Sequence, residues 1–214
     1  LKQNLEILRE VSGRAGCKIL LAQKAFSMFS VYPLLREYLA GSAASGLFEA
    51  RLGHEEFGGE THVFSAAYRE DEFDEILRYA DHVVFNSPSQ VKKYGERVKA
   101  AGKSAGLRLN PECSTQEGHA IYDPCSPGSR LGTTKRNLES AGKFETEILP
   151  YLDGYHFHTL CEQNSDALET TLAALEEKFG NYLPRLKWLN LGGGHHITRE
   201  DYDRERLIRL ILKL

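Results

Sequence analysis

Residues 187–196 read Lys-Trp-Leu-Asn-Leu-Gly-Gly-Gly-His-His, a short aliphatic run that ends in three glycines and two histidines. The run has the length and composition of a buried strand. Successive glycines let backbone N–H groups approach and bind an anion, because no side chain stands in the way. The stretch is neither a P-loop nor a dinucleotide-binding turn, since it lacks the spacing of both motifs. A flexible turn is the alternative interpretation.

The same pattern, a short strand-like run that ends in polar or glycine residues, recurs along the whole chain. The seven predicted strands are Cys17–Ala22, Gly41–Ser45, Thr61–Ser65, His82–Asn86, Gly106–Asn110, Tyr155–Thr159 and Lys187–Leu191. Apolar residues at helical spacing predict helices at the beginning of the chain and over residues 71–79 and 168–179. Thr198 and Asp201 resemble a capping box and predict that the last helix begins there.

Strands that alternate with helices predict an α/β fold with a parallel sheet, either an open doubly wound sheet or a (β/α)8 TIM-type barrel. The glycine run favours the barrel, because barrels bind phosphate after strands seven and eight. Seven strands are one short of a barrel, so we expect residues 1–214 to form one incomplete barrel domain. Prolines at positions 111, 124 and 127 predict a long loop at the carboxyl ends of the strands.

Composition excludes several classes of protein. The 214 residues carry 27 Lys+Arg against 30 Asp+Glu, a formal net charge of −3. Such a balance argues against a general nucleic-acid binder. No apolar run approaches the length of a membrane span. Cys17, Cys113, Cys125 and Cys161 are widely spaced, which predicts reduced thiols in a cytoplasmic protein. The chain begins at Leu1 without a Met, and we expect it to be part of a longer protein.

Two charged residues fall at the ends of predicted strands. Alternation places Lys24 on the face of the first strand that points into the barrel mouth, and Gln23 on the other face. A partly desolvated lysine there can form a Schiff base with a carbonyl compound, whereas a solvated lysine is the plainer interpretation. Arg108 ends the fifth strand between apolar neighbours. It needs an anionic or hydrogen-bonding partner, and a salt bridge to a neighbouring strand is the plainer interpretation.

Four histidines lie in or directly after the last two predicted strands. His156 and His158 lie on one strand face at a spacing that suits zinc, and His195 and His196 would add further ligands. A flat imidazole in a barrel mouth can instead stack on an aromatic cofactor. Both rings can also be simple packing residues, and the residues alone do not separate these interpretations.

Eight stretches together resemble a known family, the carboxynorspermidine/carboxyspermidine decarboxylases. They are Ile19-Leu-Leu-Ala-Gln-Lys-Ala-Phe26, Glu55-Glu-Phe-Gly58, His82-Val-Val-Phe-Asn-Ser87, Gly106-Leu-Arg-Leu-Asn-Pro-Glu112, Tyr122-Asp-Pro-Cys125 with Ser129-Arg-Leu-Gly132, His156-Phe-His-Thr-Leu-Cys-Glu-Gln163 and Trp188-Leu-Asn-Leu-Gly-Gly-Gly-His-His-Ile-Thr198. This family is a polyamine-forming branch of the pyridoxal 5'-phosphate (PLP) decarboxylases with a barrel like that of alanine racemase. The histidine-rich and glycine-rich stretches distinguish it from the diaminopimelate and ornithine decarboxylases.

The resemblance implies a role for each residue in a PLP site. Lys24 would be the Schiff-base lysine and His158 would stack on the cofactor ring. Gly192, Gly193 and Gly194 would hold the phosphate, and Arg108 would lie near the ring. Cys161 would lie in the loop after the sixth strand, near the phosphate. The implied reaction is decarboxylation of carboxynorspermidine or carboxyspermidine to norspermidine or spermidine by a homodimer, with no metal.

The sequence also departs from the family pattern. Leu is usual where Gln23 stands, a position that alternation aims away from the mouth. The family's eighth strand, with a Glu-Pro-Gly motif, and its C-terminal β-domain would lie beyond Leu214. The resemblance therefore implies a truncated form that is inactive alone. Two rival functions remain: a metal-dependent barrel hydrolase using the histidines of the HxH and GGGHH motifs, and a non-catalytic PLP-binding fragment.

Overall fold

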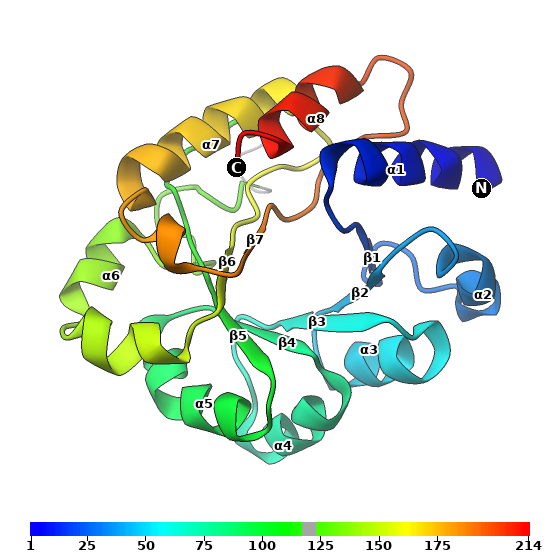
Figure 1. Cartoon of the computed structure of the whole chain (residues 1–214). Helices are drawn as coiled ribbons and strands as arrows, with labels where there is room; N and C mark the ends of the chain where they lie inside the picture. Colours follow the sequence, from blue (N-terminus) through cyan, green and yellow to red (C-terminus); the bar gives the residue numbers. More distant parts are fainter. Residues whose placement is uncertain (117–122) are drawn as a thin grey trace.

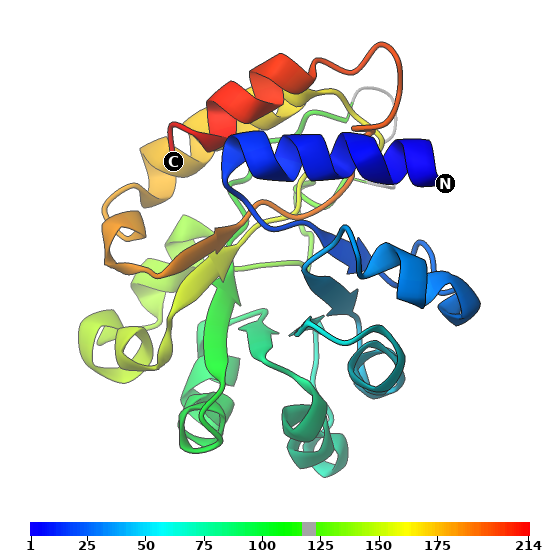
Figure 2. The same ribbon diagram turned by 45° about the vertical axis from the view of Figure 1, so that its right-hand side comes forward.

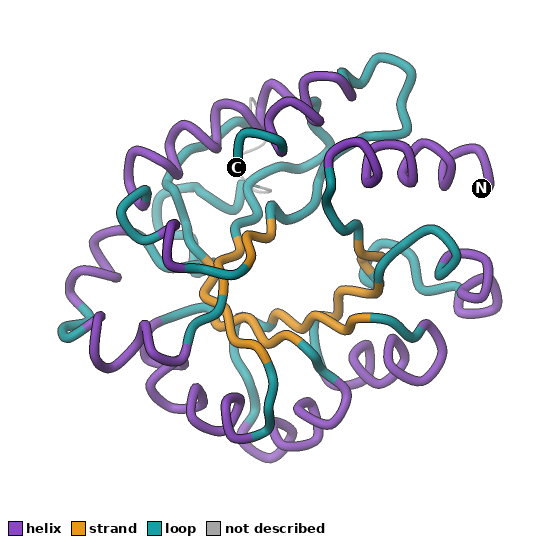
Figure 3. Tube along the Cα trace, in the orientation of Figure 1, coloured by secondary structure: helices purple, strands orange, loops and turns teal. Residues whose placement is uncertain are grey.

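The computed structural model describes residues 1–116 and 123–214 and shows one parallel sheet that curls into an arc (Figures 1 and 3). Each strand pairs with the next one in the chain, so that β1 and β7 are the two edges. This order is that of a barrel, whereas a doubly wound sheet reverses its strand order. The predicted incomplete barrel is therefore confirmed. The strands are β1 (Leu20–Ala22), β2 (Gly41–Ala44), β3 (Glu60–Phe64), β4 (His82–Phe85), β5 (Ser104–Arg108), β6 (Gly154–His156) and β7 (Trp188–Asn190).

Helices cover the outer face of the arc (Figure 2). The α-helices are α1 (Lys2–Ala15), α2 (Tyr32–Leu35), α3 (Leu47–Leu52), α4 (Glu70–Tyr79), α5 (Pro88–Ala100), α6 (Lys135–Ser140), α7 (Ser165–Phe179) and α8 (Arg204–Ile211). Short 3-10 or π-helical turns are η1 (Phe29–Val31), η2 (Gly53–Phe57), η4 (Phe144–Ile148), η5 (Leu149–Tyr151) and η6 (Leu183–Arg185). In the described part of the chain, no helix is both long enough and apolar enough to span a bilayer.

Strand alternation separates the helix-facing core from the interior of the barrel. In β3, Thr61 and Val63 are buried against the helices, while Glu60, His62 and Phe64 are only half-buried and face inward. The main hydrophobic core lies between strands and helices. There the ring of Phe73 on α4 stacks on Tyr94 of α5 with centroids 4.2 Å apart. Burial of such apolar side chains makes the largest contribution to holding the helices on the sheet.

The last helix begins later than the sequence predicts. α8 starts at Arg204, and the side chain of Asp203 caps it by accepting a hydrogen bond from the Arg206 N–H at 2.8 Å. The predicted capping box at Thr198 and Asp201 is therefore wrong. Asp201 pairs instead with Arg199 in an exposed turn ahead of the helix. α8 lies beside α1 (Figures 1 and 2), and Arg14 of α1 forms two hydrogen bonds to Glu205 of α8 at 2.6 and 2.7 Å.

Candidate active site

Lys24 lies two residues beyond the end of β1, at the carboxyl ends of the strands. Gln23 points the other way, as strand alternation predicts. Its side-chain N–H donates to the carbonyl of Glu49 at 2.7 Å, and its oxygen accepts from the Tyr32 hydroxyl at 3.2 Å. The Lys24 side chain is exposed and has no ion-pair partner among the described residues. Its charge is close enough to His158 to contribute to the lowered pKa of that ring.

Arg108 is the last residue of β5, and its side chain is 5% exposed. One guanidinium N–H donates to the carbonyl oxygen of His158 at 3.0 Å, and the guanidinium lies 4.7 Å from the centre of the Phe64 ring. Within the described part of the chain no carboxylate pairs with it, so the salt bridge considered from the sequence is absent there. Burial lowers its pKa to about 10. A buried cation with unused donors favours an anionic ligand.

His158 stands beside Arg108 and is held by the glycine run. The backbone N–H of Gly193 donates to its Nδ1 at 3.0 Å, which assigns the proton of the neutral ring to Nε2. Desolvation lowers the His158 pKa to about 3, with the charges of Arg108 and Lys24 acting in the same direction. The ring is therefore neutral at ordinary pH. An uncharged, fixed imidazole at this end of the barrel is suited to stacking on an aromatic ligand.

The three glycines differ in what they do. Gly192 and Gly194 have φ of 73° and 88°, and a Cβ at either would meet a backbone oxygen, that of Phe157 at 2.3 Å and that of Leu160 at 2.1 Å. Gly193 has no left-handed φ, and a Cβ there would meet only the His158 ring, at 3.5 Å. Within this run, backbone conformations that favour glycine are therefore confined to Gly192 and Gly194. Packing therefore does not require glycine at position 193. The absence of a side chain there leaves space in front of the loop.

The anion cradle expected of all three N–H groups is only partly available. The Gly192 N–H donates to the Asn190 side chain at 2.8 Å, and the Gly193 N–H is used by His158. The N–H groups of Gly194 and His195 have no acceptor within the described residues. These two are the donors left for a phosphate. Asn190, which the sequence pattern does not single out, is therefore a residue that shapes the loop.

The remaining candidates lie around this loop without forming a metal centre. Cys161 is exposed and follows Leu160, whose carbonyl the loop approaches at Gly194. Desolvation lowers the His195 pKa to about 4, and the Nδ1 of this ring lies 3.2 Å from the Tyr202 hydroxyl. His156 is half-buried at the end of β6. Among the described residues, the only three-membered group of potential metal ligands lies elsewhere. The geometry thus gives no support to a metal centre built on His156, His158, His195 and His196.

The loop predicted after the fifth strand runs beside the site. Asn86 at the end of β4 fixes it, because its side chain donates to the Arg130 carbonyl at 2.9 Å and accepts from the Gly132 N–H at 2.7 Å. Its other end is tied by the Thr115 hydroxyl, which donates to Gln163 at 2.8 Å. Tyr122 of the family-like stretch lies outside the described residues.

These features fit PLP. The structure offers an unpaired lysine for an aldehyde, a neutral ring for an aromatic face, two free backbone donors for a phosphate and an unpaired buried guanidinium. The space at Gly193 is on the same side as the His158 ring. Lys24 has no ion-pair partner among the described residues, and the Arg108 guanidinium keeps donors that none of them uses, so a ligand with an anionic and an aromatic part matches the site.

Comparison with solved structures shows a similar fold. No family model matches the sequence. The chain is similar in fold to diaminopimelate decarboxylase, with a TM-score of 0.74 and 18% identity over 97% of this chain and 53% of that one. The curled sheet therefore has the same fold as the barrel of diaminopimelate decarboxylase.

Other comparisons find higher sequence identity. The chain is 44% identical over 99% of its length to carboxyaminopropylagmatine decarboxylase of Synechocystis. It is 42% identical over 98% of its length to carboxynorspermidine/carboxyspermidine decarboxylase of Campylobacter jejuni. Carboxynorspermidine decarboxylase from Campylobacter jejuni, solved with norspermidine, superposes with a TM-score of 0.86 at 40% identity over 99% of this chain and 53% of that one.

The resemblance seen in the sequence motifs is therefore confirmed. The chain spans about half the length of the curated relatives it matches, 53% of each. What the comparisons support for this segment is the barrel of these decarboxylases.

Proposed function

We propose that this chain carries the cofactor-binding part of a PLP-dependent carboxy-lyase that converts carboxynorspermidine or carboxyspermidine to norspermidine or spermidine. The observation that carries the proposal is the grouping of Lys24, Arg108 and His158 at the strand carboxyl ends, with no carboxylate paired to either cation among the described residues. The similarity to decarboxylases of polyamine biosynthesis supports the same reaction type.

Each residue has a defined task in this proposal. The Lys24 amine binds the cofactor aldehyde, and the His158 ring supports the cofactor face because the Gly193 N–H fixes its orientation. The N–H groups of Gly194 and His195 bind the phosphate, with Gly192 and Cys161 shaping the loop around it. Arg108 keeps this end of the barrel electropositive, which favours the anionic cofactor. PLP, when bound, supplies an electron sink for the carbanion that loss of CO2 leaves behind.

Carboxyaminopropylagmatine is a second candidate substrate, because the relative that acts on it by name is 44% identical to this chain. Agmatine ends in a guanidine, whereas norspermidine and spermidine end in primary amines. The two candidates therefore differ at the end of the substrate remote from the bond that breaks. We also propose that the protein forms a homodimer in the cytoplasm.

The test is to mix the chain with PLP, reduce with borohydride and map the pyridoxyl label by mass spectrometry. We expect the label on Lys24. Release of CO2 is then compared on carboxynorspermidine, carboxyspermidine and carboxyaminopropylagmatine, using the chain and the longest polypeptide that its gene encodes. Size-exclusion chromatography of both reports the oligomeric state. A label on another lysine would contradict the assignment of Lys24, and release from none of the three compounds by the longer polypeptide would contradict the reaction.

A further inference from the structure

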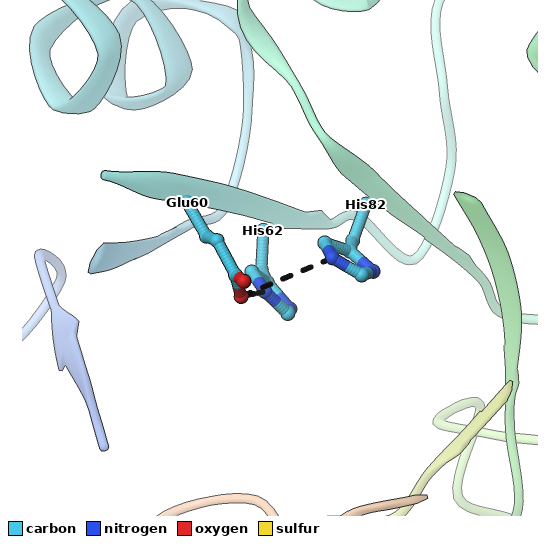
Figure 4. A group of neighbouring side chains, drawn as sticks. All are labelled: Glu60, His62 and His82. Carbon is cyan, nitrogen blue, oxygen red and sulfur yellow. Dashed lines mark hydrogen bonds and ion pairs between the residues drawn. The ribbon is translucent and has the colours of Figure 1, made fainter. Parts of the chain in front are cut away.

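A second group of side chains lies at the opposite end of the barrel from Lys24. Glu60 is the first residue of β3, His62 is two positions further on, and His82 is the first residue of β4. The parallel register pairs His62 with His82. Figure 4 shows the three side chains pointing together into the space that the strands enclose.

The donor atoms of this group converge on one point. The Nε2 atoms of His62 and His82 lie 3.1 and 3.9 Å from the same oxygen of Glu60. One donor atom from each residue lies within 4.8 Å of the others. A tetrahedral zinc ion with bonds of about 2.0–2.2 Å separates its ligand atoms by about 3.3–3.5 Å. The two distances measured from Glu60 bracket this separation, so small side-chain rotations suffice.

Hydrogen bonding inside the protein does not explain why the two rings are there. Both Nδ1 atoms are buried and have no partner among the described residues. The His82 side chain makes no hydrogen bond at all within that part of the chain, and its ring merely stacks on His62 with centroids 4.0 Å apart. A polar ring taken out of water without a partner costs stability. A ligand at the point of convergence would give a partner to the Nε2 of His82, which makes no hydrogen bond within the described part of the chain.

The charge states also suit a cation. Desolvation lowers the His62 pKa to about 4 and also lowers the pKa of His82, so both rings are neutral, and in the tautomer protonated on Nδ1 each Nε2 carries a lone pair. Burial acts to raise the Glu60 pKa, but hydrogen bonds from Lys18 and His62 outweigh it and the pKa is lowered. Glu60 is therefore ionised. Asp81 adds a further negative charge beside the two rings.

We propose that Glu60, His62 and His82 form a binding site for a divalent transition-metal ion of the zinc class, which links β3 to β4 at the amino ends of the strands. Two imidazoles and one carboxylate are a donor set that zinc uses, with a fourth position left for water. The ammonium of Lys18 pairs with the other oxygen of Glu60, not with the one that faces the rings. Lys18 is a neighbouring cation that weakens the site by repulsion.

The chain contains its own reporter for this site. Trp188 is the single tryptophan of the sequence. Its ring lies edge-on to His82, with centroids 5.4 Å apart, and near His62 at 6.4 Å. An open-shell ion such as Co²⁺ bound between the histidines would quench its fluorescence, whereas Co²⁺ at a remote surface site would not.

The experiment titrates the chelator-treated chain, without a histidine tag and without PLP, with Co²⁺ and then with Zn²⁺. We expect one Co²⁺ per chain, a tetrahedral visible absorption band, quenching of Trp188 and displacement by Zn²⁺. At free Zn²⁺ about 100 times Kd, the thermal midpoint should rise by about 5–10 °C.

Variants localise the ion. His62→Gln, His82→Gln and Glu60→Gln should each weaken Co²⁺ binding by more than the about 10–100-fold that outer hydrogen-bond partners contribute. Lys18→Ala should tighten it. His54→Gln, at an exposed histidine, is the matched control and should leave the affinity for Co²⁺ unchanged. Circular dichroism checks folding, and Glu60→Gln is nearly isosteric, so at least one informative variant remains folded.

The proposal is overturned if Co²⁺ binds without quenching Trp188, if folded Glu60→Gln keeps the affinity of the parent chain, or if no ion binds below millimolar concentration. Loss of binding on His195→Gln alone would place the ion at the other end of the barrel and would equally overturn it. None of these outcomes depends on PLP, so the test is independent of the proposed decarboxylase activity.

Discussion

The two ends of the barrel interior both hold desolvated histidines, but they surround them with opposite charges. At the carboxyl ends of the strands, the positive neighbours Arg108 and Lys24 lower the pKa of His158 beyond the effect of burial. At the amino ends, the negative neighbours Glu60 and Asp81 oppose the effect of burial on His62. The first environment suits an anion such as a phosphate or a carboxylate. The second suits a cation.

This difference arises because residues of opposite charge stand at the two ends of the strands. The same fold places the last residues of β5 and β6 at one end and the first residues of β3 and β4 at the other. Barrel enzymes place their chemistry at the carboxyl ends of the strands, which leaves the amino ends for stability. A histidine in this protein therefore has a different role at each end.

The largest expected difference between the two ends comes from substituting the two lysines on either side of β1. Lys24→Ala should abolish the borohydride-stable PLP adduct completely, because Lys24 is the unpaired lysine at the strand carboxyl end. Lys18→Ala should leave the adduct intact, since Lys18 pairs with Glu60 at the other end. Mass spectrometry after reduction measures both. An adduct that survives in Lys24→Ala and is lost in Lys18→Ala would reverse the assignment of the two ends.

A second prediction separates architecture from binding within the glycine run. Gly194→Ala should lower the free energy of unfolding by about 3 kcal/mol, because a Cβ there meets the Leu160 oxygen at 2.1 Å and φ is 88°. Gly193→Val should lower it by less than about 1 kcal/mol but weaken PLP binding at least about tenfold, since the added methyl groups occupy the space before His158. Urea unfolding and PLP titration give the two numbers. Equal PLP affinity of Gly193→Val and the parent chain would rule out the cradle.

Much of the fold was predictable because barrel strands repeat a simple pattern. All seven strands lie where the short aliphatic runs predict them, with ends shifted by a few residues; β1, for example, begins at Leu20 and not at Cys17. The beginning of α8 was not predictable from Thr198, because Asp203 offers an equally good cap closer to the apolar face of the helix. Capping signals alone do not choose between two acceptable caps.

The positions of the candidate site residues were predictable, but their hydrogen bonds were not. Lys24, Arg108, His158 and the glycines are placed at the carboxyl ends by strand phase alone. That the Gly193 N–H binds His158 depends on packing between the ends of β6 and β7, which the sequence does not encode locally. The group of Glu60, His62 and His82 was missed for a related reason. Only the register of β3 on β4 brings the two histidines together, although Glu-x-His at one strand start and His at the next were visible signals.

We expect acid to lower the free energy of unfolding because both ends of the barrel hold desolvated neutral histidines. One variant at each end separates the two contributions. His62 has an ordinary pKa of 6.5 and a folded value of about 4, so the unfolded chain takes up protons first as the pH falls. The stability from this residue is complete above pH 6.5 and is lost toward pH 4, by up to about 1.4 kcal/mol per pH unit. His62→Gln in chelator should make this decline shallower by that amount, as measured by urea unfolding at several pH values. His158→Gln should do the same at the other end. An unchanged slope in both variants would contradict the desolvated neutral rings.

The smallest predicted effect is the change in the free energy of unfolding when Arg108 is replaced. Its sign tests the interpretation. The guanidinium is buried with one hydrogen bond and no described carboxylate partner, so in the absence of ligand its desolvation is poorly compensated. Arg108→Met should therefore raise the free energy of unfolding of the PLP-free chain by about 1 kcal/mol, raise the His158 pKa by removing a positive neighbour, and weaken PLP binding. Urea unfolding and an NMR titration of the His158 ring measure the first two effects.

Arg97→Met is the matched control for Arg108→Met, because the Arg97 guanidinium also lies over a phenylalanine ring, that of Phe73 at 5.0 Å, but pairs with Glu70 and Asp74. It should lower stability by about 0.5–1 kcal/mol and leave His158 unchanged. If Arg108→Met destabilises the PLP-free chain as Arg97→Met does, Arg108 is a structural residue. The positive charge at the strand carboxyl ends would then not indicate an anion-binding site. Only the proposed metal-binding group at the amino ends would distinguish the two ends.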